Sequence, residues 1–151
     1  MGSRTFRDMA GYWPTSTDEY AAPMNQIPKA VFSKQGSAIL EAARLVRDKP
    51  DALQPGAESW AQAYVASGDL VAEVAKLKAQ DGKPMLAYGG AAFARSLIAH
   101  GLVDQFDLMV HPLVLGQGLP IFTALPHRRR LTLVSSTAFP KGSLAQIYRP
   151  A

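Results

Sequence analysis

Two adjacent glycines, Gly89 and Gly90, stand between an apolar stretch and an alanine-rich pattern of helical spacing. The pattern predicts a buried strand over residues 84–88 and a helix over residues 91–100. Glycines at such a junction let the backbone approach a flat or anionic ligand. The helix start that follows offers unpaired N–H groups and a positive dipole end, which suit a pyrophosphate. For an isolated glycine pair, a tight strand-to-helix turn is the better explanation, so the interpretation as a ligand site depends on the neighbouring motifs.

Three other segments carry related chemistry. Residues 2–5 (GSRT) place a glycine, two hydroxyls and a guanidinium at a predicted helix start, a combination that can hold a phosphate. Ser33 and Lys34 follow a predicted strand, at the position where ligands bind in open α/β sheets. Residues 67–69 (SGD) precede another helix. Helix capping alone explains the first and third segments, and none of the segments is a G-x-G-x-x-G fingerprint.

Few other residues suggest catalysis. The chain has no cysteine, which excludes disulfides, thiolate metal sites and thiol catalysis. Its three histidines, His100, His111 and His127, lack metal-ligand spacing. The sequence therefore predicts no metal site and identifies no catalytic residue.

The composition limits the classes of partner. With 151 residues, 48% hydrophobic and 19% charged, the chain predicts one globular domain over residues 1–151. It has neither a long apolar run nor a secretory leader pattern, so we expect a cytoplasmic protein without a membrane partner. The net charge of +4 comes from scattered basic residues, apart from the run at 128–130, and no aromatic residues interleave that run. We expect no nucleic-acid partner and a small phosphorylated molecule as ligand.

The coarse pattern alternates helices and strands before it turns to strands alone. Helices are expected over residues 3–10, with Ser3 as N-cap, over residues 69–79, capped by Ser67 or Asp69, and over residues 91–100. A further helical piece begins at residue 36 and leads into a Pro/Gly loop that extends to residue 59. The expected strands cover residues 28–33, 61–65, 84–88, 105–114, 119–122, 131–136 and 144–148. This order predicts an α/β domain with a mixed, mostly parallel sheet and antiparallel C-terminal strands.

Taken in order, the segments GSRTF, YWP, PKAVFS, SGDLVAEVAKLK, YGGAAFARSL and GLVDQFDLMVHPLVLGQGLPIF resemble the dihydrofolate-reductase-like family. The likeness is greatest to the reductase domain of the bifunctional riboflavin-biosynthesis deaminase-reductase and its stand-alone bacterial relatives. It covers nearly the whole chain, is most specific over residues 101–122, and leaves residues 36–59 longer than is usual. The resemblance implies a three-layer α/β fold, NADPH as cofactor, and hydride transfer to a pteridine or ribosylaminopyrimidine-like substrate.

The resemblance also implies a set of cofactor contacts. The helix start would contact the phosphates, the two serine-containing segments would lie along the adenosine half, and the glycine pair would pass the pyrophosphate and nicotinamide. In this order the residues are Gly2, Ser3, Arg4 and Thr5; Ser33 and Lys34 with Ser67, Gly68 and Asp69; and Gly89 and Gly90, with Ala91 and Ala92 opening the next helix. A cation at Arg4 or Lys34 would favour the 2′-phosphate of NADPH over NADH.

One departure from the family concerns the start of the chain. Family members carry a strand and a helix before the Gly-x-Arg-Thr motif, which supply a central strand and an acidic residue facing the substrate, whereas this sequence starts at Met1 and Gly2. We expect an unpaired slot in the sheet and a homodimer that covers it. Three functions stay open: a reductase, an NADPH-binding module without turnover, and a structural or oligomerisation domain on a degenerate reductase fold.

Overall fold

The computed structural model describes residues 1–123, 125 and 127–151. Within these residues the chain forms two compact units, Met1–Phe93 and Ala94–Ala151, each of which is described by itself. The single domain expected over residues 1–151 stays a prediction.

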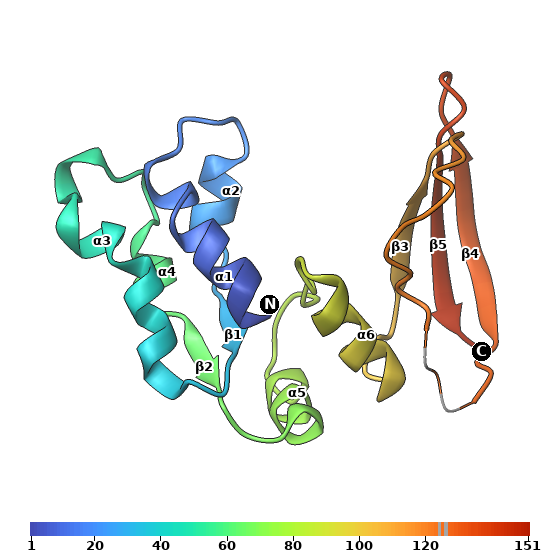
Figure 1. Cartoon of the computed structure of the whole chain (residues 1–151), viewed down its shortest axis with the longest axis horizontal. Coiled ribbons are helices and arrows are strands. Elements are labelled where there is room, and N and C mark those ends of the chain that lie inside the picture. Colours follow the sequence, from blue (N-terminus) through green and yellow to red (C-terminus); the bar gives the residue numbers. More distant parts are fainter. Residues whose placement is uncertain (124, 126) are drawn as a thin grey trace. The chain divides into compact units, whose positions relative to one another are not determined.

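The first unit combines short helices with a small parallel sheet (Figure 1). Its elements are α1 (Ser3–Ala10), η1 (Trp13–Thr15), α2 (Ala21–Gln26), β1 (Ala30–Phe32), η2 (Gly36–Ala43), α3 (Leu45–Asp48), η3 (Pro50–Ala52), α4 (Glu58–Ala61), β2 (Tyr64–Ala66) and α5 (Leu70–Lys78), where η denotes a 3₁₀ helix.

Helix α1 supplies one wall of the core. Phe6 and Ala10 lie four residues apart, so they share a helix face, and both are fully buried. The Phe6 ring packs against Trp60 of α4 with 5.9 Å between ring centroids. The helix predicted over residues 3–10 is confirmed, but the prediction that Ser3 caps it is wrong. Gly2 occupies the N-cap position in an extended conformation, and Ser3 is the first helical residue.

The parallel sheet brings three segments of the first unit side by side. Strands β1 and β2 pair in parallel with Phe32 opposite Ala66. On the other side of β1, Gly2 forms a parallel bridge with Phe32, and the Phe32 N–H donates to the Met1 carbonyl at 2.9 Å. The strands expected at residues 28–33 and 61–65 are confirmed, the second with its centre moved toward Ala66. All three segments therefore end at the same edge of the sheet.

Residues 36–59 fold into short helices that close the core. Ile39 and Ala43 of η2 are buried beside Phe6 and Trp60. The helical piece expected from residue 36 is confirmed, and the following segment contains η3 and a turn before α4. Helix α3 ends at Asp48 and does not continue into η3, because the ring of Pro50 and its missing N–H prevent a continuous helix.

Two predicted strands do not form. Residues 84–88 adopt no strand, and Leu86 is 74% exposed. Residues 119–122 likewise lie outside the strands, with Leu119 78% exposed. A strand exists only when a neighbour accepts and donates its backbone hydrogen bonds. In the described part of the chain neither segment has such a neighbour, and Pro120 has no N–H to offer.

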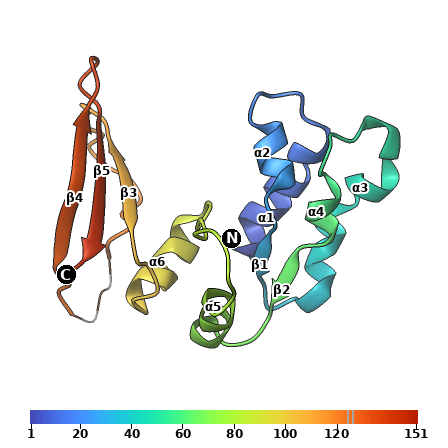
Figure 2. The ribbon, with the colours of Figure 1, turned by 180° about the vertical axis from the view of Figure 1, so that it is seen from behind.

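The second unit is built on an antiparallel sheet. Helix α6 (Ala91–Ala99) begins in the first unit and continues into the second, as predicted for residues 91–100. Strands β3 (Phe106–Val110), β4 (Leu131–Ala138) and β5 (Leu144–Pro150) follow in the spatial order β3-β5-β4 (Figure 2).

The strands of the second unit match the remaining predictions with one shortening. β4 and β5 confirm the strands predicted over residues 131–136 and 144–148, and their ladder is irregular between Leu133 and Ser135. β3 ends at Val110, short of the predicted residue 114, since Pro112 lacks a backbone donor. The chain therefore combines helices with parallel and antiparallel sheets, as predicted for this fold class. Within the described ranges, we find no helix with the length and apolar character needed to cross a membrane.

Candidate functional site

The predicted motifs of the first unit meet at the carboxyl edge of its parallel sheet. Because Gly2, Phe32 and Ala66 are paired across the sheet, Ser3, Ser33 and Ser67 each take the next position at that edge. The Ser33 N–H donates to the Ala66 carbonyl at 3.0 Å, which extends the pairing to the last residue before the loops. Ligands of open α/β sheets bind outside this edge. We refer to the segments that follow these paired positions, residues 2–5, 33–35 and 67–69, as the carboxyl edge.

The start of α1 presents backbone donors at the carboxyl edge. The first N–H groups of a helix have no partner within the helix, and Gly2 has no side chain that could cap them. A Cβ at residue 2 would lie 3.3 Å from the Cβ of Phe93, so a larger residue would crowd that side chain. Arg4 is exposed and Thr5 is partly buried. This arrangement is suited to an anion.

The glycine pair packs on the start of α1. Gly89 and Gly90 have φ angles of +73° and +69°, the left-handed region that side chains disfavour. A Cβ at Gly89 would lie 2.4 Å from Thr5 Cγ2, and one at Gly90 would lie 3.2 Å from Thr5 Oγ1. Two motifs far apart in the sequence therefore form one surface. Ala91 opens α6 as predicted, and Ala92 follows within its first turn.

The loop after β1 is held against α1. Ser33 is buried, and its Oγ accepts a hydrogen bond from the Gln35 N–H at 3.2 Å. The guanidinium of Arg7 donates to Gln35 Oε1, which links the loop to α1. Lys34 between these residues is exposed, so its ammonium is available at the carboxyl edge.

The loop after β2 is shaped by two carboxylates. Asp69 is the N-cap of α5, and its Oδ1 accepts from the Ala72 N–H at 3.0 Å. Of the two caps considered, Asp69 and not Ser67 therefore caps the helix, and Ser67 is exposed. Glu73 Oε1 accepts from the Gly68 N–H at 3.3 Å, and its Oε2 accepts from the Tyr64 hydroxyl at 2.6 Å.

The chemistry available at the carboxyl edge is electrostatic binding. Backbone N–H groups, hydroxyls, the Arg4 guanidinium and the Lys34 ammonium can bind phosphate oxygens. All three histidines of the chain lie beyond residue 93, outside the first unit. No cluster of three His, Asp or Glu side chains with metal-binding geometry occurs among residues 1–123, 125 and 127–151. The site as described could hold a phosphorylated cofactor, and it contains no side chain that we assign as a general acid.

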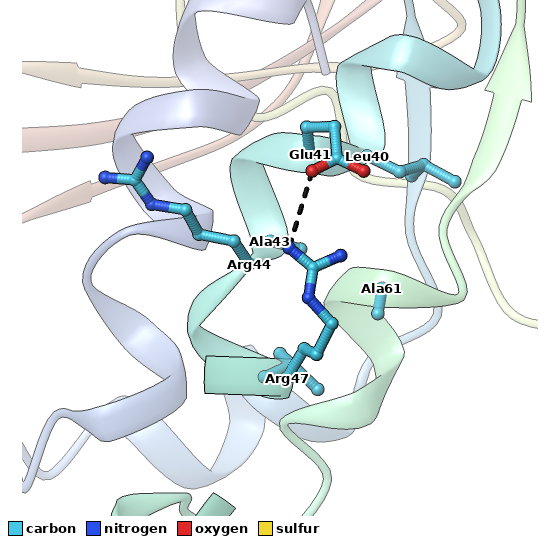
Figure 3. A pocket seen from close by; sticks show the side chains of 7 residues that line it. Leu40, Glu41, Ala43, Arg44, Arg47 and Ala61 are labelled. Atoms are coloured by element: carbon cyan, nitrogen blue, oxygen red, sulfur yellow. Dashed lines mark ion pairs between the residues drawn. The ribbon is translucent and has the colours of Figure 1, made fainter. Parts of the chain in front are cut away.

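Two surface cavities lie apart from the predicted site residues. One, of about 300 Å³, is lined by Leu40, Glu41, Ala43, Arg44, Val46, Arg47 and Ala61 (Figure 3). The Arg47 guanidinium reaches across it to Glu41 at 3.5 Å, and both side chains are mostly exposed. The other, of about 260 Å³, belongs to the second unit and includes Phe106 and Phe122. Neither cavity includes a residue of the carboxyl edge, so we assign the candidate site from the sheet geometry.

Sequence reasoning missed the side chains that hold the loops. Glu73 contacts the 67–69 loop and is itself bonded by Tyr64, Arg7 contacts the 33–35 loop, and Phe93 packs on Phe32 with 5.0 Å between ring centroids. An acidic residue in the first turn of α5 is visible in the sequence, but its usual reading is a favourable interaction with the helix dipole. No local spacing connects Glu73 to Tyr64, because that contact depends on where β2 lies.

Comparison with solved structures supports the mixed architecture of helices with parallel and antiparallel sheets. The fold is similar to that of a putative riboflavin biosynthesis protein from Shewanella sp. PV-4, with a TM-score of 0.58 and 19% identity over 82% of this chain and 60% of that one. It is also similar to a pyrimidine reductase-like protein from Corynebacterium diphtheriae, with a TM-score of 0.55 and 20% identity over 99% of this chain and 74% of that one.

Sequence relatives are similar over part of their length. The uncharacterized protein YyaP of Bacillus subtilis (strain 168) is 39% identical over 87 residues, which are 58% of this chain and 46% of the relative. The uncharacterized protein YwjB of the same organism is 31% identical over 74 residues, 49% of this chain and 41% of the relative. The matches therefore span less than half of the length of either curated relative. The model of one family, the RibD C-terminal domain, matches residues 1–145, and this protein thus belongs to the RibD C-terminal domain family.

Proposed function

We propose that this protein is an NADPH-dependent reductase that transfers a hydride to a C=N bond of a pteridine or a ribosylaminopyrimidine-like substrate in the cytoplasm. The observation that carries the proposal is the convergence at the carboxyl edge. The start of α1, the 33–35 loop and the 67–69 loop end on one side of the parallel sheet, and the glycine pair packs on Thr5 beside them. Membership of a reductase-like family supports the reaction class.

The residues present fit a dinucleotide. An added Cβ at Gly89 would collide with Thr5, and one at Gly90 would crowd the Thr5 hydroxyl, so glycine at both positions lets this backbone lie close to the start of α1, where the phosphates would bind. The N–H groups at the start of α1 and the Thr5 hydroxyl would hold the phosphates. NADPH supplies the hydride when bound, and the protein's part is to bind and orient it.

The choice of NADPH over NADH rests on charge. Arg4 and Lys34 are exposed at the carboxyl edge, and neither side chain enters an ion pair within the described residues. A charge-assisted contact to a phosphate is stronger than a neutral hydrogen bond, so either cation would favour the cofactor with the additional 2′-phosphate.

A second candidate is a nucleotide-binding module without turnover. One observation favours it: the first unit, which carries the carboxyl edge, contains no histidine, and the two carboxylates at the 67–69 loop already have structural partners, since Asp69 caps α5 and Glu73 binds two donors. Hydride transfer needs a proton source in addition to the cofactor.

A titration with NADPH and NADH, followed by a turnover assay, tests these alternatives. Arg4→Ala should lower NADPH affinity by roughly 10- to 100-fold, because a hydrogen bond to a charged group contributes about 1.5–3 kcal/mol, and it should lower NADH affinity less. Arg44→Ala removes an exposed guanidinium at the cavity of Figure 3 and should leave both affinities unchanged. Equal loss for the two nucleotides would remove Arg4 from 2′-phosphate recognition.

The glycine pair provides the second arm of the experiment. Gly90→Val should abolish binding of either nucleotide, because the branched side chain would crowd Thr5 at the approach to the backbone. Since the φ of +69° also costs stability, the variant is assayed under conditions in which circular dichroism shows it folded. Binding with turnover on a ribosylaminopyrimidine supports the reductase, and binding without turnover supports the module. If the parent protein binds neither nucleotide, the structural or oligomerisation domain is the remaining candidate and the proposal is refuted.

A further inference from the structure

Glu73 joins three parts of the first unit through one carboxylate. Its Oε2 accepts a hydrogen bond from the Tyr64 hydroxyl of β2 at 2.6 Å, a short charge-assisted contact. Its Oε1 accepts from the backbone N–H of Gly68 at 3.3 Å. Glu73 itself belongs to the first turn of α5. The carboxylate therefore links the strand, the loop and the helix that together form one side of the carboxyl edge.

Gly68 and Glu73 are matched to each other. A Cβ at residue 68 would lie 2.9 Å from Glu73 Oε1, so a side chain there would force the carboxylate to shift away from the loop. The lack of a side chain at residue 68 thus lets the carboxylate reach the loop backbone. Gly68 does not have a positive φ, so its backbone conformation does not require glycine, and the contact with the Glu73 carboxylate is what an added side chain would disturb.

Lys76 orients the phenol of Tyr64. The Lys76 Nζ donates to the Tyr64 hydroxyl at 3.0 Å and lies 5.2 Å from the centre of the ring. A hydroxyl has one hydrogen, so accepting from Lys76 leaves it free to donate that hydrogen to Glu73. The donors therefore converge on Glu73: Lys76 donates to Tyr64, Tyr64 donates to the carboxylate, and the Gly68 N–H donates to the same carboxylate from the loop.

We propose that Glu73 is a positioning residue for the dinucleotide site, which it serves by holding the 67–69 loop in its bound shape before the cofactor arrives. The inference rests on the proposed function, because the loop matters for binding only if the carboxyl edge holds the cofactor. Glu73 acts through the Gly68 backbone and does not contact the ligand. A loop that is already ordered loses less conformational entropy when a ligand binds to it.

Four variants separate this role from a general effect on the fold. Glu73→Ala removes both contacts. Glu73→Gln keeps an oxygen for the Gly68 N–H and an amide N–H that can donate to the Tyr64 oxygen, while it removes the charge. Tyr64→Phe is milder, since it leaves the contact to Gly68 in place. Glu58→Ala is the matched control, because Glu58 is also a glutamate in the first turn of its helix, α4.

Amide hydrogen exchange without nucleotide and NADPH titration give two separate readouts. Glu73→Ala should speed exchange of the Gly68 amide and weaken NADPH binding, each by roughly tenfold, at a thermal midpoint close to that of Glu58→Ala. Glu73→Gln should restore most of both quantities, and Tyr64→Phe should have an intermediate effect. Unchanged exchange of the Gly68 amide in Glu73→Ala would overturn the inference.

The charge of Glu73 offers a competing explanation that the same variants decide. If the carboxylate only repelled the cofactor phosphates, Glu73→Ala and Glu73→Gln would both bind NADPH more tightly than the parent, which would overturn the positioning role. The exchange measurement contains no nucleotide. It therefore reports whether Glu73 holds the loop even when the parent binds no NADPH, the result that refutes the proposed function.

Discussion

Replacement of Gly89 by alanine tests how tightly the glycine pair packs on α1. The added Cβ would lie 2.4 Å from Thr5 Cγ2 and 2.8 Å from Thr5 Oγ1, at a backbone φ of +73°. The left-handed conformation costs a residue with a side chain about 1–2 kcal/mol. Overpacking of the kind that moves backbone or side chains adds about 1–3 kcal/mol. We therefore expect Gly89→Ala to lower the free energy of unfolding by about 2–5 kcal/mol, the sum of these two ranges.

Two further variants divide this loss into its parts. Gly36 has a φ of +57° and nothing within 4 Å of the position its Cβ would take, so Gly36→Ala should show only the backbone cost of about 1–2 kcal/mol. The double variant Gly89→Ala/Thr5→Ala removes both of the nearest Thr5 atoms and leaves Thr5 Cβ at 3.1 Å. It should recover most of the steric loss, and a double-mutant cycle isolates that coupling.

Urea unfolding followed by circular dichroism measures these differences, provided that the slope of the transition is the same in each variant. The expected order of stability is the parent, then Gly36→Ala, then Gly89→Ala, with a favourable coupling between the alanines at 89 and 5. Equal losses in Gly89→Ala and Gly36→Ala, with no coupling to Thr5, would refute the packing of the glycine pair on α1. The glycine pair would then no longer belong to the candidate site at the carboxyl edge.

Three further predictions concern a helix cap, a buried lysine and the oligomer. Asp69→Ala should lower the free energy of unfolding by about 0.5–2 kcal/mol through loss of the Ala72 N–H contact, whereas Ser67→Ala should change it little; urea unfolding of both variants checks this. Burial lowers the pKa of Lys29 from 10.5 to about 8, against an opposing effect of Glu58, so the native state binds fewer protons than the unfolded state between these values. The free energy of unfolding should therefore rise by roughly 1–3 kcal/mol from pH 8 to 10.5, and Lys29→Met should flatten the rise; a parent profile as flat as that of Lys29→Met would contradict the assignment. The expected homodimer should sediment as a two-chain species with an interface above about 1,000 Å², and a stable monomer at micromolar concentration would exclude it.

Local pattern predicted the elements that depend on neighbours along the chain. The helix expected over residues 3–10 depends on residues close in sequence, and in α1 Phe6 and Ala10, four residues apart, share its buried face. Glycines at 89 and 90 before an alanine-rich stretch predict a turn followed by a helix, and α6 begins at Ala91. These features are predictable because hydrogen bonding within a helix, and the conformational freedom of glycine, involve only residues close in sequence.

The sequence also identified the segments of the candidate site without their arrangement. Residue types at predicted helix and strand ends indicate residues 2–5, 33–34, 67–69 and 89–90. Their convergence at one edge depends on the parallel pairing of β1 with β2 and with Gly2, which no window of the sequence contains. The resemblance to a reductase family supplied that expectation, and the register supplies its physical basis.

Tertiary structure decided the outcomes that depend on a distant partner. The apolar residues at 84–88 and 119–122 have strand-like composition, but a strand also needs a hydrogen-bonding neighbour, and the described residues provide none for them. Likewise, Ser67 and Asp69 were equal as caps by residue type, and the position of the side-chain oxygen selected Asp69. The contact of Glu73 with Tyr64 exists because β2 delivers the phenol to the first turn of α5. Sequence thus determined which residues can bend, cap or bind, and long-range pairing determined which of them meet.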